Sequence, residues 1–334
     1  MQSDFAVVLV VVGALAFAFT NGFRDTFDQI STAVSTRAAP LRAAIAAVAL
    51  LNFAGAFISV AVAATIAQDV VDAAQIAPVV ILAGLLGAIV WNLATWRLGL
   101  PSSSSHALIG GLLGASVAAA GTSALIGGGV LDKVLIPALL APIAAFGLAA
   151  CAIAVLYRLF GQRRPGPVTR GFRRAQLLSG SLLALAHGAN DAQKTMGVIA
   201  LALIANGSLG AASDPPFWVI VTAAAAVALG TWIGGLRVMR GRGTPIIEMD
   251  AAQGFSAQGA GAATILVATF LGFPISSTHA ISGGVLGAGA AKRVSAVRWG
   301  VAGNIVVAWL LTLPAAAAIG AAAYGIAWVL GAGA

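Results

Sequence analysis

Long apolar stretches separated by short polar ones make up almost the whole chain. The stretches are continuously apolar and rich in Ala, Leu and Gly, without the alternation of apolar and polar residues that marks the strands of a membrane barrel. Stretches of about 20 such residues predict membrane-spanning helices. They run over Phe5–Phe19, Ala43–Ala67, Ile76–Trp96, Val134–Tyr157, Leu177–Ala205, Phe217–Leu236, Ala260–Phe273 and Val301–Leu330.

Composition supports this reading. Of the 334 residues, 60% are hydrophobic and only 8% are charged, so the pattern predicts an all-α, polytopic membrane protein. The first apolar stretch leads into a polar motif without a small-residue cleavage site, so we expect no cleaved signal. We expect a multi-pass protein of the cell (plasma or inner) membrane.

The basic residues predict the orientation of the chain. They cluster at Arg37 and Arg42, between Arg158 and Arg174, at Arg237, Arg240 and Arg242, and at Lys292, Arg293 and Arg298. The positive-inside rule places these clusters in the cytoplasm and the N-terminus outside. Because the bases lie between spans, the net charge of +8 indicates topology and contact with lipid headgroups rather than nucleic-acid binding.

One motif occurs twice. PSSSSHALIGGLLGA (101–115) and PISSTHAISGGVLGA (274–288) are identical at ten of fifteen positions. The charge pattern gives the two copies opposite orientation, which predicts an inverted-topology repeat: residues 1–160, a basic cytoplasmic linker 161–175, and residues 176–334. Pro101 and Pro274 predict broken helices, either as re-entrant hairpins, which we favour, or as pairs of full spans.

The duplicated serine-rich loops are candidate anion sites. Hydroxyls that directly precede a helix lie beside its unpaired N–H groups and the positive end of its dipole. The alternative is ordinary N-capping; the duplication favours a functional role. His106 and His279, one in each loop, titrate near neutral pH when unperturbed and are candidates for proton coupling, or else are neutral hydrogen-bonding groups.

A second duplicated pair carries charge inside apolar surroundings. In NGFRDTFDQ (21–29) and HGANDAQKT (187–195), Asp25 aligns with Asp191 and Arg24 with Asn190. Charges at such depth cost about 2.5–3.5 kcal/mol each, so they indicate ion or substrate pathways. The alternative is internal pairing of Arg24 with Asp28 and of Asp191 with Lys194. Arg97, four residues before Pro101, is a further candidate for attracting an anion or pairing with one of these acids.

Together these motifs resemble the inorganic phosphate transporter (PiT) family over nearly the whole chain. NGFRDT, WNLATWRLGLPSSSSHALIGGLLGA, AHGANDAQKTMGVIALAL, AQGFSAQ and GFPISSTHAISGGVLGAGAAKR occur in the family's order. Two positions depart from the family: Asp28 stands where Asn is common, and Arg24 where His or Asn is found.

The resemblance implies a central phosphate site and cotransport with Na⁺ or H⁺, in some members of a metal-phosphate complex. It implies substrate binding by Ser103, Ser104, Ser105, Ser276, Ser277 and Thr278, and it matches Asp25, Asn190 and Asp191 to the family's cation-linked motif. Asn190 is also a candidate substrate ligand, and the hard side-chain oxygens of Asn21, Asp25, Asp28 and Asp191 suit a coupling cation. Accessory residues are Arg24, Arg97, His106, His279, Gln193 and Lys194.

The predicted function is therefore symport of inorganic phosphate by alternating access in a lipid bilayer. No cofactor beyond the coupling ion is expected, and we consider a homodimer as the assembly. A sulfate permease on the same scaffold is the nearest alternative. An intramembrane hydrolase built on Ser105 and His106 is disfavoured, because a second similar loop has no catalytic purpose and G-x-S-x-G is absent.

Overall fold

The computed structural model describes residues 2–35, 40–238 and 249–331 and is helical almost throughout, without strands in these ranges. The helices are α1 (Gln2–Ser35), α2 (Leu41–Gly55), α3 (Ala61–Gln68), α4 (Pro78–Arg97), α5 (Ser104–Ala120), α6 (Gly127–Gly129), α7 (Ile136–Phe160), α8 (Pro165–Ala205), α9 (Phe217–Val238), α10 (Ala251–Phe270), α11 (Ser277–Lys292) and α12 (Trp299–Val329). A π-helical segment, Val130–Leu135, joins α6 to α7.

The distribution of polar groups is the reverse of that in a water-soluble protein. Large apolar side chains face outward, with Leu139, Phe217 and Leu310 each about two-thirds or more exposed, whereas Asp191 and Lys194 are buried. Such an apolar exterior suits lipid. Among the described residues, five helical segments are long and apolar enough to cross a membrane: Asp4–Thr26, Pro78–Arg97, Gly127–Phe160, Phe217–Gly235 and Trp299–Val329. The chain is thus a multi-pass membrane protein.

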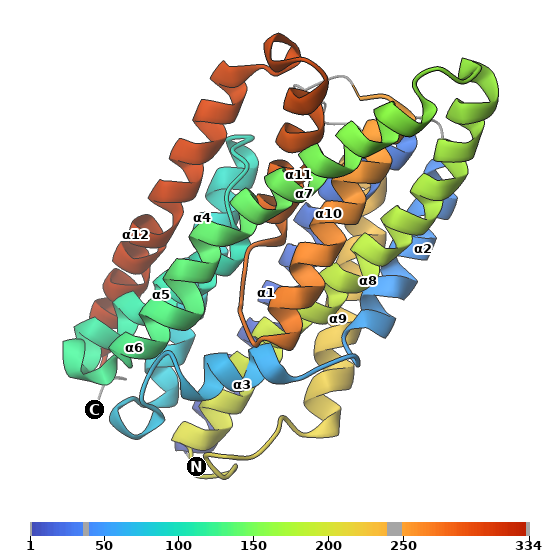
Figure 1. The fold of residues 1–334 in the computed structure, drawn as a ribbon. Coiled ribbons are helices and arrows are strands. Elements are labelled where there is room, and N and C mark those ends of the chain that lie inside the picture. Colours follow the sequence, from blue (N-terminus) through green and yellow to red (C-terminus); the bar gives the residue numbers. More distant parts are fainter. Residues whose placement is uncertain (1, 36–39, 239–248, 332–334) are drawn as a thin grey trace.

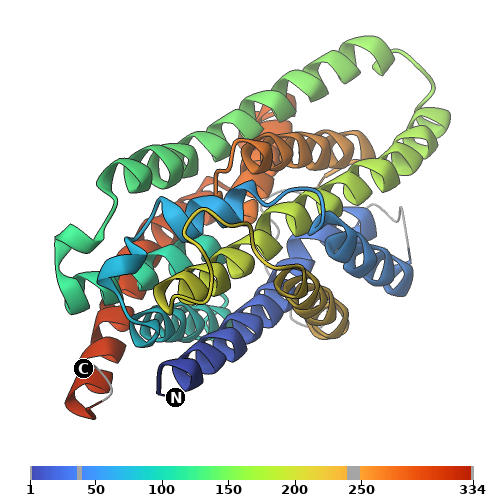
Figure 2. The same ribbon diagram turned by 90° about the horizontal axis from the view of Figure 1, so that it is seen from below.

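Helices from the two halves of the chain are packed against one another. α5 packs on α12 and α11 on α7, while α1 packs on α9 and α8 on α2 and α3 (Figures 1 and 2). At two of these contacts the aligned glycines Gly114 and Gly287 bring backbones together, because an added Cβ would lie 2.0 Å from Ala317 O and 2.1 Å from Phe146 O. Small residues allow such close approach inside a membrane. Each cross-contact of the first half therefore has a counterpart in the second.

The two proline motifs break the helices as the sequence predicts. α4 ends at Arg97 and α10 at Phe270, and each is followed by a glycine with positive φ, Gly99 (67°) and Gly272 (74°). The backbone then runs without helix to the N-cap residues Ser103 and Ser276, and α5 and α11 begin at the next residue. Two helices consequently start inside the protein rather than at its ends. Whether the pairs are re-entrant in a bilayer stays a prediction.

Two predicted segments have a different structure. The stretch Ala43–Ala67 is not one span, because the helix stops after Gly55 and resumes at Ala61. The N–H groups of Val62 and Ala63 at the new start donate to Gln193 Oε1 of α8, at 2.8 and 3.3 Å, so a tertiary contact caps the second piece. The predicted basic linker 161–175 is largely exposed but becomes helical from Pro165, which is tolerated in a first turn.

The basic connections between helices lie at one end of the molecule. The basic α7–α8 and α11–α12 connections share one end, and both termini and α3 lie at the other (Figure 1). Arg37, Arg240 and Arg242, which contribute to the predicted orientation, fall outside the described residues.

Candidate functional site

The two serine-rich loops meet in the interior. The rings of His106 and His279, in the first turns of α5 and α11, lie 4.6 Å apart in an edge-to-face arrangement. The hydroxyl-bearing residues of both loops are nearly inaccessible, with exposed fractions of 7% or less: Ser102, Ser103, Ser104, Ser105, Ser276, Ser277 and Thr278. Two helix N-termini, each the positive end of a dipole, are thus buried side by side.

One serine in each loop is a helix cap. Ser103 Oγ accepts a hydrogen bond from the His106 N–H at 3.1 Å, and Ser276 Oγ accepts one from the His279 N–H at 3.3 Å. These two hydroxyls satisfy their own helices, as the capping alternative expects. Their role as substrate ligands stays a prediction.

The next hydroxyls reach the charged motifs of α1 and α8. Ser104 Oγ donates to Asn21 Oδ1 at 2.5 Å and lies 3.4 Å from Asp25 Oδ2. Ser277 Oγ donates to Asp191 Oδ2 at 2.9 Å. The structure therefore joins each anion loop to the acidic motif of its own half, as the duplicated sequence suggests.

Lys194 connects the second acidic motif to both loops. Its ammonium donates to Ser105 Oγ at 2.5 Å and to the Ile275 carbonyl at 2.7 Å, and it forms an ion pair with Asp191. The predicted internal pairing of Asp191 with Lys194 is confirmed, but it is only one of three contacts. A permanent positive charge consequently lies between the loops.

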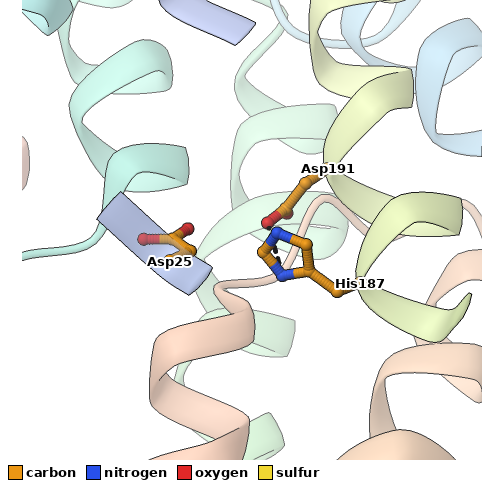
Figure 3. A group of neighbouring side chains, drawn as sticks. All are labelled: Asp25, His187 and Asp191. Atoms are coloured by element: carbon orange, nitrogen blue, oxygen red, sulfur yellow. Dashed lines mark ion pairs between the residues drawn. The ribbon is translucent and has the colours of Figure 1, made fainter. Parts of the chain in front are cut away.

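Among the described residues, one group of three His, Cys, Asp or Glu side chains has the spacing of a cation site: Asp25, His187 and Asp191. All three are buried, and one ligand atom from each lies within 4.8 Å of the others. Figure 3 shows Asp25 from α1 beside the two α8 side chains, with His187 Nδ1 3.1 Å from Asp191 Oδ2. His187 Nε2 has no hydrogen-bond partner among the described residues. Two carboxylates and an unsatisfied imidazole fit a proton or a metal cation.

The aligned residues Arg24 and Asn190 tie the acidic helices to the breaks. Arg24 donates to Asn92 Oδ1 at 2.6 Å and to the Ser102 carbonyl at 3.1 Å. Asn190 Nδ2 donates to Thr269 Oγ1 at 3.0 Å and to the Phe273 carbonyl at 3.2 Å, and its buried Oδ1 has no partner among the described residues. Both side chains therefore position the ends of α4 and α10.

The remaining candidates lie elsewhere. Arg97 is exposed in the last turn of α4 and makes no ion pair with a described acid, so the expected pairing is not seen, while attraction of an anion stays a prediction. Gln193 caps α3 instead of facing the loops. Thr278 is buried in the first turn of α11. The Asp28 side chain lies outside the described residues, so its predicted pairing and cation role are untested.

His106 and His279 face an apolar region. They line a cavity of about 620 Å³ between α7 and α12, together with Ile143, Leu310 and other apolar residues, and His279 stacks on Trp309 at 3.8 Å between ring centroids. Their Nε2 atoms are buried and have no partner among the described residues. Proton coupling through these histidines stays a prediction.

Several participants were not foreseen. His187 aligns with Asn21, so the duplication itself was a signal for it. Asn92 and Thr269 are polar residues within apolar stretches, where a buried polar group usually has a specific partner. The Ile275 carbonyl had no sequence signal, because its availability depends on the extended backbone before α11.

Comparison with known proteins gives one consistent result. A family model described as "Phosphate transporter family" matches residues 21–320. A "probable low-affinity inorganic phosphate transporter" of Mycobacterium tuberculosis is 49% identical over 98% of this chain and 79% of its own length. The similarly described protein of Rhizobium meliloti is 47% identical over 95% of both chains.

A solved structure described as "The sodium-dependent phosphate transporter" has the same fold. It matches 98% of this chain and 99% of its own with a TM-score of 0.88, at 23% identity. The paired serine loops, the paired acidic motifs and the match of the family model from Asn21 onward converge on one conclusion: the chain belongs to the phosphate transporter family.

Proposed function

We propose that the chain carries inorganic phosphate across the membrane by symport with a cation, at a site between the N-termini of α5 and α11. The observation that carries the proposal is the convergence of Ser104, Ser105 and Ser277 with the buried Lys194 at two facing helix starts. Helix N-termini, hydroxyls and an ammonium are donors that suit a tetrahedral oxyanion.

The local charge explains why a cation accompanies phosphate. The described charged groups around the loops are two carboxylates, Asp25 and Asp191, and two bases, Arg24 and Lys194, which balance one another. A phosphate anion brought into this dry region would be uncompensated. Outward-positive membrane potential adds about 2.3 kcal/mol per negative charge for each 100 mV. A cation bound beside phosphate offsets both costs.

We assign the cation to the Asp25, His187 and Asp191 group, within reach of the hydroxyls of the loops. Ser277 donates to Asp191, and Ser104 lies beside Asp25, so occupancy of the cation group changes the hydrogen bonding of the same hydroxyls that contact phosphate. Binding of the two species is therefore coupled. The coupling ion under this proposal is H⁺ or Na⁺.

The transport cycle follows from the paired halves. We propose an inverted repeat of residues 1–160 and 176–334, an N-terminus outside the cell (plasma or inner) membrane, and alternating access around the central loops. The exchanged packing of α5 on α12 and α11 on α7 supports it, because such pairs can move as units about a fixed site. A homodimer is the assembly to examine.

Uptake of labelled phosphate into proteoliposomes tests the function. With purified protein, we expect accumulation when an inward H⁺ or Na⁺ gradient is imposed and only equilibration without one. Absence of gradient-driven accumulation would reject the symport proposal. Empty liposomes are the control for leakage.

Competition distinguishes phosphate from sulfate. If the site binds phosphate, excess unlabelled phosphate should abolish uptake of the label, while excess sulfate should leave it largely unchanged. The preference should depend on pH, because phosphate changes from monoanion to dianion near neutral pH whereas sulfate stays a dianion. Stronger inhibition by sulfate would favour a sulfate permease. A serine hydrolase has no support here, because the Ser105 hydroxyl donates to Ile275 O and accepts from Lys194 rather than bonding to His106.

A further inference from the structure

The Lys194 ammonium has the surroundings of a bound monovalent cation. Its three partners are a carboxylate of α8, a hydroxyl at the start of α5 and a backbone carbonyl just before α11: Asp191, Ser105 and Ile275. Carboxylate, hydroxyl and carbonyl oxygens are the ligands that hard cations take in proteins. The side chain is 1% exposed, so the ammonium is fully desolvated at this position.

The first half holds a side-chain cation at the equivalent carbonyl. Ser102 and Ile275 each follow the proline of the repeated motif, and the Ser102 carbonyl accepts from Arg24 Nη2 at 3.1 Å. Both breaks therefore direct a carbonyl at a fixed positive charge. The two cations come from non-equivalent positions of α1 and α8, so this occupancy is not a simple consequence of the repeat.

A purely structural ion pair does not account for the position of Lys194. Pairing with Asp191 requires one contact within α8, at i,i+3 spacing. The other two contacts leave α8 and join both broken loops, 89 and 81 residues away along the chain. These are the oxygens that a mobile cation would use to hold the loops together.

We propose that Lys194 is a tethered substitute for a sodium ion and makes phosphate transport by this chain independent of Na⁺. The ammonium supplies the same unit charge without an ion being bound and released. Of the two candidate coupling ions, the neighbouring Asp25, His187 and Asp191 group then takes the proton, because its imidazole nitrogen is a ligand for protons or transition metals rather than for Na⁺. This inference rests on the proposed phosphate transport and specifies its ion.

Two measurements on the wild-type protein test the inference without any variant. With the pH gradient held constant, replacing choline chloride by sodium chloride at equal ionic strength should leave phosphate uptake unchanged. In detergent, the same exchange should leave the thermal unfolding midpoint unchanged, because an ion that binds the folded state raises it. Severalfold stimulation of uptake by Na⁺, or a Na⁺-specific rise in the midpoint, overturns the inference.

Lys194→Met keeps the length of the side chain and removes the charge, so it leaves the oxygens of Asp191, Ser105 and Ile275 without their cation. Uptake in choline should fall by about tenfold or more, because Asp191 loses its buried partner. Sodium should restore part of the uptake and should raise the unfolding midpoint of the variant. Lys292→Met, at an exposed lysine paired with Asp250, is the matched control and should not gain a response to sodium.

The outcomes separate this inference from the proposed function. A folded Lys194→Met protein without any sodium response overturns the tethered-cation role even if the wild type carries phosphate. If the variant does not fold, the wild-type measurements decide. Wild-type liposomes that accumulate no phosphate under any gradient reject the transport proposal instead. The thermal measurement in detergent still tests whether Lys194 takes the place of a sodium ion.

Discussion

The two halves of the central site are alike at the anion loops and unlike at the charges behind them. Both halves cap the broken helix with a serine and direct the next hydroxyls toward an acidic motif. In the second half a single lysine links the acid to both loops. In the first half, Arg24 donates hydrogen bonds to Asn92 and Ser102, and Asn21 Oδ1 accepts one from the Ser104 hydroxyl. The two loops thus share their capping geometry and differ in the charged side chains that contact them.

The largest effect is expected at the acids. Asp191→Asn removes the charge that compensates Lys194 in a fully buried site, and an uncompensated buried charge costs about 3–5 kcal/mol. In the first half the nearest loop hydroxyl, Ser104 Oγ, lies 3.4 Å from Asp25 Oδ2, whereas Ser277 Oγ lies 2.9 Å from Asp191 Oδ2. Asp191→Asn and Asp25→Asn should both lose gradient-driven uptake. Thermal unfolding in detergent and uptake in liposomes measure the two effects separately.

An Asp191→Asn variant as stable as the wild type would contradict a buried ion pair with Lys194. The double variant Asp191→Asn with Lys194→Met is the control, because it removes both charges of the pair. It should recover most of the stability lost by Asp191→Asn alone while uptake stays low.

The sequence predicted more of the site than of its connections. Composition gave the membrane class, and the duplicated motifs gave the paired loops, the acids and the helix breaks at Gly99 and Gly272. The interruption after Gly55 had no local signal, since no proline or glycine run follows, and it depends on Gln193 reaching the N–H groups of Val62 and Ala63. The hydrophobic periodicity could not predict this interruption, because it depends on a contact between residues far apart in the chain.

The packing of the acidic helices is expected to be symmetric, which gives the second test. An added Cβ at Gly188 would lie 2.1 Å from Asn52 O, and one at Gly22 would lie 2.2 Å from Val227 O. Gly188→Ala and Gly22→Ala should each destabilise by about 1–3 kcal/mol or more, because neither backbone can move aside alone. Thermal unfolding measures the loss.

The matched control for these two variants is Gly147→Ala in α7, where an added Cβ meets nothing within 4 Å. It should be neutral or slightly stabilising, since alanine favours the helix by up to about 1 kcal/mol over glycine. A clear loss at only one of Gly22 and Gly188 would show that the halves differ in packing as well as in charge.

The hydroxyls provide a third, smaller contrast. Ser277 donates to a carboxylate, and such bonds are worth about 1.5–3 kcal/mol, whereas Ser104 donates chiefly to the neutral Asn21, worth about 0.5–1.5 kcal/mol. Ser277→Ala should therefore cost more stability than Ser104→Ala, and both variants should raise the half-saturating phosphate concentration. The exposed Ser123→Ala is the control and should leave it unchanged. Unchanged affinity in both loop variants would remove these serines from the site.

The smallest difference in stability is expected at the N-termini of α4 and α10, the helices that precede the two breaks. Asp250 caps α10, while Ala77 stands at the start of α4 without a side-chain cap. Burial opposes ionisation of Asp250, but hydrogen bonds from Lys292, the Gln253 N–H and Tyr157 outweigh it and lower its pKa below the ordinary 3.8. Asp250→Ala should cost about 1 kcal/mol near neutral pH.

The pH dependence of that loss has a defined sign. Because the pKa of Asp250 is lowered by folding, its contribution is full above 3.8 and is lost as the pH falls through the folded-state value. The difference in unfolding midpoint between the wild type and Asp250→Ala should therefore shrink below about pH 4. A difference that grows on acidification would show that the carboxylate is not stabilised by its partners.

An experimental structure with a heavy tetrahedral analogue of phosphate, such as arsenate located by its anomalous signal, would show where the anion binds. We expect one anion between the first turns of α5 and α11, within hydrogen-bonding distance of the Ser104 and Ser277 hydroxyls. An anion bound only elsewhere, for example at the basic connection between α7 and α8, would contradict this expectation.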